Sequence, residues 1–123
     1  MLKKGIALLT AIGSMGLAAL PQLPAKAASC GYASHYGVGD GYGGQRTASG
    51  ERMDPYDHTA ASLEFPLGTR LRVTDQRTGR SVVVRINDRG PYAGGRVLDL
   101  SYGAFSSIRN PGAGETLVCY SRI

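Results

Sequence analysis

The run Ser81-Val82-Val83-Val84-Arg85-Ile86 constrains the fold more than any other part of this sequence. Its β-branched residues favour a strand, and so apolar a run predicts a strand that is buried on both faces. Directly after it the chain becomes polar, and Gly90-Pro91 prevents further ladder pairing. Asp88 stands at this point, between Arg85 and Arg89. It either starts a turn or presents a carboxylate for proton chemistry at the end of a rigid strand.

Glycine, proline and polar residues divide the remaining sequence into short segments. Alternation of apolar and polar residues predicts further strands over 31–36, 69–75, 96–100 and 116–120. A compact hairpin link is expected over 76–79. About five or six short strands without a βαβ rhythm are typical of an all-β fold, here a small closed barrel.

Helical structure is expected at two places. Ser101 is a suitable N-cap for a helix that ends near Ile108, because Asn110-Pro111-Gly112 follows. Gly103 is expected to weaken that helix by about 1 kcal/mol relative to alanine. A single helical turn is expected over 58–62, too short to be stable alone.

Residues 1–27 have the pattern of a secretory signal peptide. A basic start precedes an apolar segment of small residues, and Ala25-Lys26-Ala27 fits an A-x-A cleavage site. Its removal leaves residues 28–123 as one domain. This domain keeps nine acidic residues and eleven arginines, so its net charge falls from +5 to about +2. We therefore expect an exported protein that resides in the periplasm or cell envelope, or is secreted.

Arginine is the only basic residue besides histidine in residues 28–123. Its planar guanidinium suits carboxylates, phosphates and sugar hydroxyls. For an exported chain, an anionic polymer such as cell-wall glycan is a more reasonable partner than nucleic acid. The chain is expected to act as a monomer.

Two cysteines, Cys30 and Cys119, allow two interpretations. In an exported protein an even pair predicts a disulfide, which here joins the two ends of the domain. The chain-entropy model gives such a bond an upper value of about 4–5 kcal/mol. Alternatively, Cys30 is a lipid-attachment cysteine that follows Ala27-Ala28-Ser29, a degenerate lipobox.

The sequence predicts neither a metal site nor a cofactor. His35 and His58 have no third ligand at a suitable spacing. A serine nucleophile lacks both its elbow motif and a credible base. The tyrosines at positions 32, 36, 42 and 92 either stack on sugar rings or pack in the barrel and its loops.

Six blocks of this sequence occur in the order found in one known family. The blocks are Ala33-Ser34-His35-Tyr36-Gly37, Thr47-Ala48-Ser49-Gly50-Glu51, Thr59-Ala60-Ala61, Phe65-Pro66-Leu67-Gly68-Thr69, Val82-Val83-Val84-Arg85-Ile86-Asn87-Asp88-Arg89-Gly90-Pro91 and Asp99-Leu100-Ser101. The set and its spacing are specific, and they resemble the rare lipoprotein A (RlpA) family of septal-ring lytic transglycosylases over residues 28–123.

The resemblance implies a six-stranded double-psi β-barrel with one or two short helices, as in expansins. It also implies cleavage of peptidoglycan between N-acetylmuramic acid and N-acetylglucosamine. The preferred substrate would be glycan strands without stem peptides, and the products would carry 1,6-anhydro ends. By position, Asp88 matches the catalytic aspartate and Glu51 the acidic residue of the motif.

The chemistry that the resemblance implies needs one carboxylic acid at the cleaved bond. A lytic transglycosylase uses the 6-hydroxyl of the sugar as nucleophile, so one residue protonates the leaving oxygen and then deprotonates that hydroxyl. We expect Asp88 to do this, with Glu51 orienting the sugar or acting on Asp88 through its charge. Arg85 and Arg89 would act on Asp88 with the opposite sign.

Tyr36, Arg85 and Arg89 are the expected substrate-binding residues. Asp99 is a further one, because an aspartate in the matching Asp-Leu-Ser block of expansins is functional. Its alternative role is to cap the helix that Ser101 begins or to close the barrel.

The sequence departs from the family pattern at Ser62. Members with the full motif have histidine there, and that histidine is taken to be catalytic; His58 lies four residues earlier. The alternative function is therefore an expansin-like module that binds or loosens the cell wall without catalysis. A third possibility is a secreted inhibitor or signalling protein on the same barrel.

Overall fold

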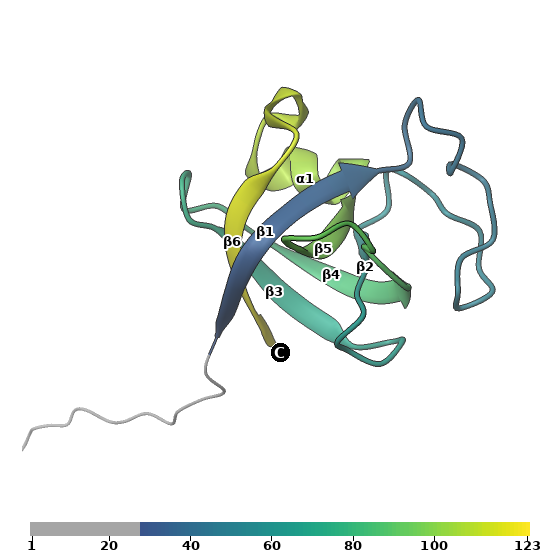
Figure 1. The fold of residues 1–123 in the computed structure, drawn as a ribbon, viewed down its shortest axis with the longest axis horizontal. Helices are drawn as coiled ribbons and strands as arrows, with labels where there is room; N and C mark the ends of the chain where they lie inside the picture. The colour runs from purple at the N-terminus through teal and green to yellow at the C-terminus, as the bar shows by residue number, and fades with distance from the viewer. Residues whose placement is uncertain (1–27) are drawn as a thin grey trace, which may run out of the picture.

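The computed structural model describes residues 28–123, which form a closed barrel of six strands and one α-helix (Figure 1). The expected signal peptide lies outside these residues. No helix among the described residues is long and apolar enough to cross a membrane. The elements are β1 (Ser29–Tyr36), β2 (Thr59–Ala61), β3 (Arg70–Asp75), β4 (Ser81–Asp88), β5 (Arg96–Ser101), α1 (Tyr102–Ile108), η3 (Pro111–Ala113) and β6 (Thr116–Arg122).

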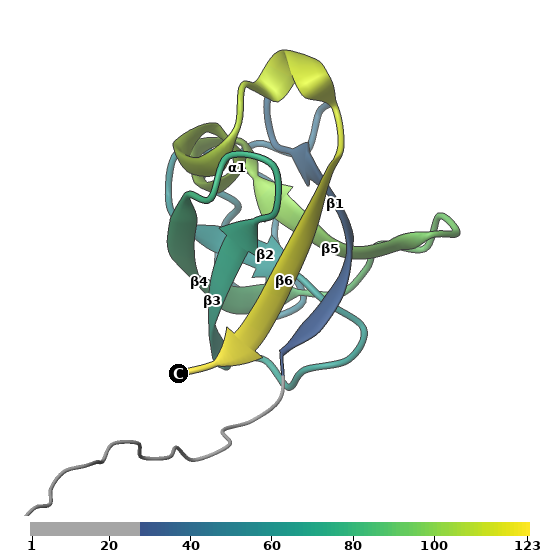
Figure 2. The same ribbon diagram turned by 90° about the vertical axis from the view of Figure 1, so that its left-hand side faces the viewer.

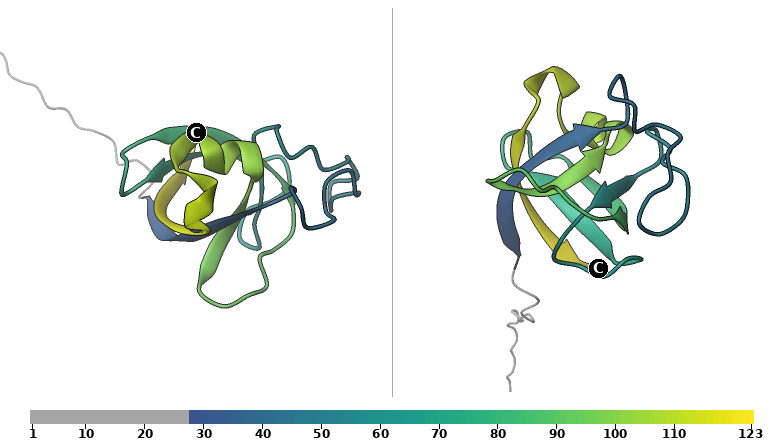
Figure 3. Two further views of the ribbon diagram at one scale, coloured as in Figure 1. Left: turned by 90° about the horizontal axis from the view of Figure 1, so that it is seen from above. Right: turned by 45° about the vertical axis from the view of Figure 1, so that its right-hand side comes forward.

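The strands follow one another around the barrel in the order β1-β5-β2-β4-β3-β6. The pairs β1–β5 and β2–β4 are parallel, and the other four pairs are antiparallel. Parallel neighbours cannot be joined by a hairpin, so long connections cross the barrel to reach them. The longest connection, over residues 37–58, extends to one side of the barrel (Figure 3).

The core fills the barrel and the space beneath α1. Strand β3 alternates between exposed and buried residues, as its sequence predicts. Strand β4 also alternates between buried and more exposed residues over most of its length. The expectation that it is buried on both faces was therefore wrong. In a closed barrel one face of each strand points outward, and β4 carries Val83 and Arg85 there. The fully buried large apolar residues are Leu71, Val73, Val84, Ile86, Leu98, Leu100, Phe105, Ile108 and Val118.

Strand β2 corrects a second expectation, because Thr59–Ala61 is extended and not helical. All three residues are buried between β4 and β5. Two alanines have no strong preference for a strand, and their small side chains fit where three strands come close together. Tertiary pairing therefore overrides the local tendency to form a helical turn.

Helix α1 confirms its predicted bounds and its cap. The side chain of Ser101 accepts a hydrogen bond from the backbone N–H of Ala104, as an N-cap residue does. The buried residues of the helix close one end of the barrel, and η3 follows beside it (Figure 2).

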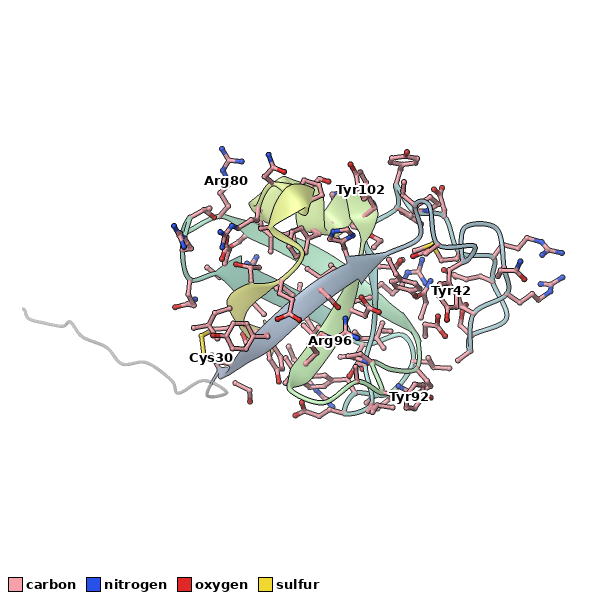
Figure 4. All side chains as sticks on the ribbon, turned by 45° about the horizontal axis from the view of Figure 1, so that its top comes forward. Cys30, Tyr42, Arg80, Tyr92, Arg96 and Tyr102 are labelled. Carbon is pink, nitrogen blue, oxygen red and sulfur yellow. A yellow bond between two sulfur atoms is a disulfide. The ribbon has the colours of Figure 1, made fainter. Side chains whose placement is uncertain are left out.

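Cys30 and Cys119 form a disulfide between directly opposed residues of β1 and β6. The disulfide interpretation of the two cysteines is therefore confirmed, and neither thiol is free. Figure 4 shows Cys30 near the start of β1.

Candidate functional site

A cleft of about 420 Å³ lies beside the ends of β1 and β4. Both of its main carboxylates were expected from the sequence, namely Asp88 and Asp99. In Figure 4, Tyr42 and Tyr92 lie in the half of the molecule away from Cys30, and Arg96 lies between Cys30 and these tyrosines. The cleft is lined by Tyr36, Tyr42, Arg46, Ala61, Asp88, Arg89, Gly90, Pro91, Tyr92, Arg96 and Asp99.

Asp88 is the last residue of β4, and its half-buried carboxylate accepts three hydrogen bonds. The backbone N–H groups of Ala48 and Arg89 donate to Oδ1, at 3.0 and 2.9 Å. The hydroxyl of Tyr36 donates to Oδ2 at 2.9 Å. Asp88 forms no salt bridge with any residue that the structure describes. Its carboxylate is thus held in one orientation while it remains open to the cleft.

Tyr36 stands at the end of β1 and is only 8% exposed. Burial and the charge of Asp88 raise the pKa of its hydroxyl far above the usual value. The hydroxyl therefore keeps its proton at neutral pH and remains a donor to Asp88. Its ring meets that of Tyr42 edge to face, with 5.8 Å between centroids. Tyr36 is consequently better placed to orient Asp88 than to stack flat on a sugar.

Asp99 lies within β5 and does not cap α1, because that cap is Ser101. Its Oδ1 accepts a hydrogen bond of 2.9 Å from Ser34 Oγ, and Arg96 Nη1 donates to the same hydroxyl. Burial raises the pKa of Asp99, although Ser34 and Arg96 counteract the effect. The cleft thus contains a second carboxyl that binds a proton more readily than an exposed aspartate does.

Glu51 lies beside the strand that carries Asp88, but it is not among the residues that line the cleft. Its carboxylate forms a salt bridge of 3.0 Å with Arg85 and accepts a 2.7 Å hydrogen bond from Asn87. These two partners lower the pKa of Glu51. Arg85 is likewise absent from the lining residues. Glu51 is therefore an ionised group that ties residues 47–51 to β4, and its catalytic role stays a prediction.

Arg89 lines the cleft and also holds the segment after β2 in place. Its Nη1 donates to the carbonyl oxygens of Ser62 and Phe65, each at 2.7 Å. Ser62 itself is fully buried. Its hydroxyl accepts hydrogen bonds from the backbone N–H groups of Glu64 and Phe65, at 2.9 and 3.0 Å. Because its hydroxyl is directed at this turn, Ser62 does not replace an imidazole in the cleft.

The two histidines lie outside the cleft. A ring nitrogen of His35 lies 2.9 Å from the carbonyl oxygen of Pro111, and the ring packs against Phe105. His58 lies 3.5 Å from the hydroxyl of Ser107. Within residues 28–123, no cluster of three or more histidine, cysteine or acidic side chains could hold a metal ion.

Sequence reasoning missed two cationic residues of the cleft, Arg46 and Arg96. A signal was present for each. Arg46 directly precedes the Thr47–Glu51 block, and Arg96 stands three residues before Asp99. Of the predicted tyrosines, Tyr42 and Tyr92 line the cleft and are 57% and 79% exposed. Tyr32 lies elsewhere on β1.

Comparison with known proteins identifies the relatives of this chain. A family model described as lytic transglycolase matches residues 28–120. A Nostoc protein named "Probable endolytic peptidoglycan transglycosylase RlpA" is 58% identical over 84 residues, which cover 68% of this chain and 23% of that protein. A Pseudomonas aeruginosa protein named "Endolytic peptidoglycan transglycosylase RlpA" is 47% identical over 78 residues, or 63% of this chain and 22% of that protein. The chain thus spans about a quarter of the length of these relatives.

Solved structures agree on the fold. An expansin of Clavibacter michiganensis, crystallised with cellohexaose, superposes with a TM-score of 0.63 at 23% identity, covering 79% of this chain and 50% of the expansin. The Streptomyces papain inhibitor also gives a TM-score of 0.63, at 19% identity, and covers 83% of this chain and 99% of the inhibitor. These likenesses concern the fold alone, and they confirm the expected all-β double-psi barrel. The chain therefore belongs to the lytic transglycolase family and is a member of its RlpA group.

Proposed function

We propose that this chain is a lytic transglycosylase that cleaves peptidoglycan glycan strands in the cell envelope. The observation that carries this proposal is the presentation of Asp88. Its carboxylate stands in an open cleft, oriented by three donors and not neutralised by a salt bridge with any described residue. The names of the relatives give the substrate class, and the disulfide is consistent with export.

In the proposed reaction, Asp88 first donates a proton to the glycosidic oxygen. The bond between this oxygen and C1 of N-acetylmuramic acid breaks, and the leaving N-acetylglucosamine keeps the proton as a hydroxyl. The 6-hydroxyl of the muramic acid residue then attacks C1 and gives its proton to Asp88. The product is a 1,6-anhydro end, and the acid is restored without consumption of water.

Neighbouring side chains support these steps. A phenolic hydroxyl can donate or accept a hydrogen bond, so Tyr36 can stay bonded to Oδ2 in both protonation states of Asp88. Asp99, Arg89, Arg46 and Arg96 offer acceptors and donors for sugar hydroxyls and acetamido groups. Glu51 does not line the cleft, but it holds Asn87 and Arg85 of β4, which gives it a positioning role.

Product analysis tests the proposal. Purified protein is incubated with amidase-treated sacculi, and the soluble sugars are identified by mass spectrometry. We expect anhydro-muramyl products from the wild type and none from Asp88→Asn, because the loss of a positioned acid costs about 10²–10⁴ in rate. Asp54→Asn is a matched control, since that carboxylate is exposed and outside the cleft. A folded wild type that releases no such product contradicts the proposal.

Glu51→Gln separates two roles of this residue. A positioning role predicts lower thermal stability together with slower product release, because the salt bridge to Arg85 is lost. A role in proton transfer predicts, besides the same loss of stability, a change in the pH dependence of product release.

Ser62 favours a second candidate function, an expansin-like module that binds the wall without catalysis. The buried hydroxyl is engaged by the turn that follows, so the position of the family histidine supplies no titrating group. This candidate predicts that the protein sediments with sacculi and creates no new chain ends.

A further inference from the structure

A second depression, of about 470 Å³, lies on the β6 side of β1. It shares no lining residue with the cleft. Tyr32 comes from β1, Arg77 from the hairpin between β3 and β4, Arg109 from the end of α1, and Leu117 from β6. Figure 4 shows Arg80, which belongs to the same hairpin as Arg77, on the opposite side of the molecule from Tyr42 and Tyr92.

The depression has an exposed aromatic and aliphatic wall. Tyr32 and Leu117 are opposed in the β1–β6 register, so their side chains lie side by side on the outer surface. They are 49% and 41% exposed. An exposed tyrosine ring can stack on the apolar face of a sugar while its hydroxyl remains in water.

Two arginines and one glutamate, Arg77, Arg109 and Glu115, line the depression, so its net charge is positive. The Arg77 guanidinium forms no hydrogen bond or salt bridge with the described residues, and only its backbone N–H bonds to Asp75. Arg109 is held in place, because its Nη1 donates at 3.0 Å to Thr116 Oγ1, which in turn donates at 2.7 Å to the fully buried Asp75. One guanidinium is thus fixed and the other is available, an arrangement suited to carboxylates.

The depression and the cleft both lie along β1, one at Tyr32 and the other at Tyr36. Tyr32, Ser34 and Tyr36 alternate with the core residue Ala33, so they point to the same side of the strand. At the usual rise per residue, Tyr32 and Tyr36 are about 13 Å apart. Tyr32 is also opposed to Arg96, a residue of the cleft. The spacing of the two sites therefore allows one chain of several sugars to contact both.

We propose that this depression is a second binding site for the amino-sugar strand, and that it recognises carboxylates borne by the strand. The inference rests on the proposed function for its substrate class. The carboxylate comes either from the lactyl group of a bare strand or from the stem peptide of a substituted strand. Tyr32 supplies the stacking surface, and Arg77 and Arg109 bind the carboxylate.

Calorimetric titration of Asp88→Asn protein, which leaves strands uncut, tests the site. The probes are a bare peptidoglycan hexasaccharide, the same strand with stem peptides, and chitohexaose, which has no carboxylate. Tyr32→Ala and Arg77→Gln are added to this background. Tyr56→Ala and Arg80→Gln are matched controls, because both residues are exposed and line neither site.

We expect Tyr32→Ala to lower the affinity for both peptidoglycan strands about tenfold, which corresponds to a loss of about 1.4 kcal/mol in binding free energy. Arg77→Gln is expected to lower the affinity for these strands about threefold, because exposed charge pairs contribute little to binding. The affinity for chitohexaose should not change. An effect of Arg77→Gln on the bare strand identifies the lactyl group, whereas an effect confined to the substituted strand identifies the peptide.

Variants that bind every probe as tightly as the controls would overturn the second site. So would a loss of chitohexaose binding in Arg77→Gln equal to that of the peptidoglycan strands. Failure of the proposed lytic activity can be told apart from failure of the second site. In that case the wild type binds strands with a contribution from Tyr32 but releases no anhydro product.

Discussion

Ser62 occupies the position where the resemblance leads us to expect a histidine, but its hydroxyl does not take over the chemistry of an imidazole. It is buried and accepts two backbone hydrogen bonds, so it caps the turn that leads from β2 toward β3. Arg89 binds the carbonyl oxygen of the same residue. At this residue the chain has a structural group in place of a titrating one, so the acid–base groups of the cleft are the carboxyls of Asp88 and Asp99.

We expect Ser62→Ala to lower the free energy of unfolding by about 1 kcal/mol, because the backbone N–H groups of Glu64 and Phe65 lose the hydroxyl that accepts their hydrogen bonds. Product release per folded molecule should not change, since the hydroxyl does not face the cleft. Urea unfolding measures the first quantity and the sacculus assay the second. A variant that is stable but inactive would assign Ser62 a direct role in the reaction.

Asp99 makes the stability of the fold depend on pH in a predictable direction. Burial raises its pKa in the folded state, so the folded protein binds this proton more tightly than the unfolded chain does. Its contribution is complete below the pKa of an unfolded aspartate, about 3.9, and is lost as the pH rises through the raised folded value. Asparagine at position 99 does not titrate, so Asp99→Asn does not lose stability in this way as the pH rises.

The stability of Asp99→Asn relative to wild type should therefore increase between about pH 4 and neutrality. The midpoint of thermal unfolding, measured for both proteins across this range, checks the prediction. Asp54→Asn, which removes an exposed carboxylate, serves as the control. A difference that does not vary with pH would show that Ser34 and Arg96 fully compensate for burial.

Among the elements, helix α1 packs through Gly103 against the backbone of residues 55–56, a contact that the helix sequence does not predict. Helix propensity alone marks Gly103 as a weak point. In the structure, however, its N–H donates at 2.7 Å to the carbonyl oxygen of Pro55, and the backbone of Tyr56 lies against the glycine. A Cβ atom at position 103 would lie 2.9 Å from the carbonyl oxygen of Tyr56. Glycine is therefore needed for the long connection after β1 to pack on the helix.

Gly103→Ala should destabilise the protein by about 1–2 kcal/mol, although propensity predicts a gain of about 1 kcal/mol. Ser106→Ala in the same helix is the control, because Ser106 is exposed and its replacement should be close to neutral. The free energy of unfolding is measured in urea for all three proteins. A more stable Gly103→Ala would mean that the 54–57 segment moves away without cost.

The elements differ in how far the sequence predicts them. Strand β3 and helix α1 could be predicted because alternation and an N-cap are local signals. Strand β2 could not, because its extended form depends on pairing with β4 and β5. For the cleft, Asp88 could be predicted from its place after a strand. The separation of Glu51 from the cleft depends on the packing of residues 47–51 against β4, which the sequence does not specify.

For the whole molecule, the disulfide joins the first and last strands of the barrel across 89 residues of sequence. Cys30→Ser with Cys119→Ser should lower the free energy of unfolding by about 2–5 kcal/mol. A thiol reductant should destabilise the wild type by a similar amount and should leave the double variant unchanged. Urea unfolding with and without reductant measures both effects. A wild type whose free energy of unfolding is the same with and without reductant would contradict the prediction.

The hydrogen bond between Tyr36 and Asp88 spans 52 residues, and that between Ser34 and Asp99 spans 65. No short fragment of the chain contains these partners together, so the cleft comes into being only when the barrel closes. Recovery of the proposed lytic activity during refolding should therefore coincide with closure of the barrel, so that product release reports completed folding.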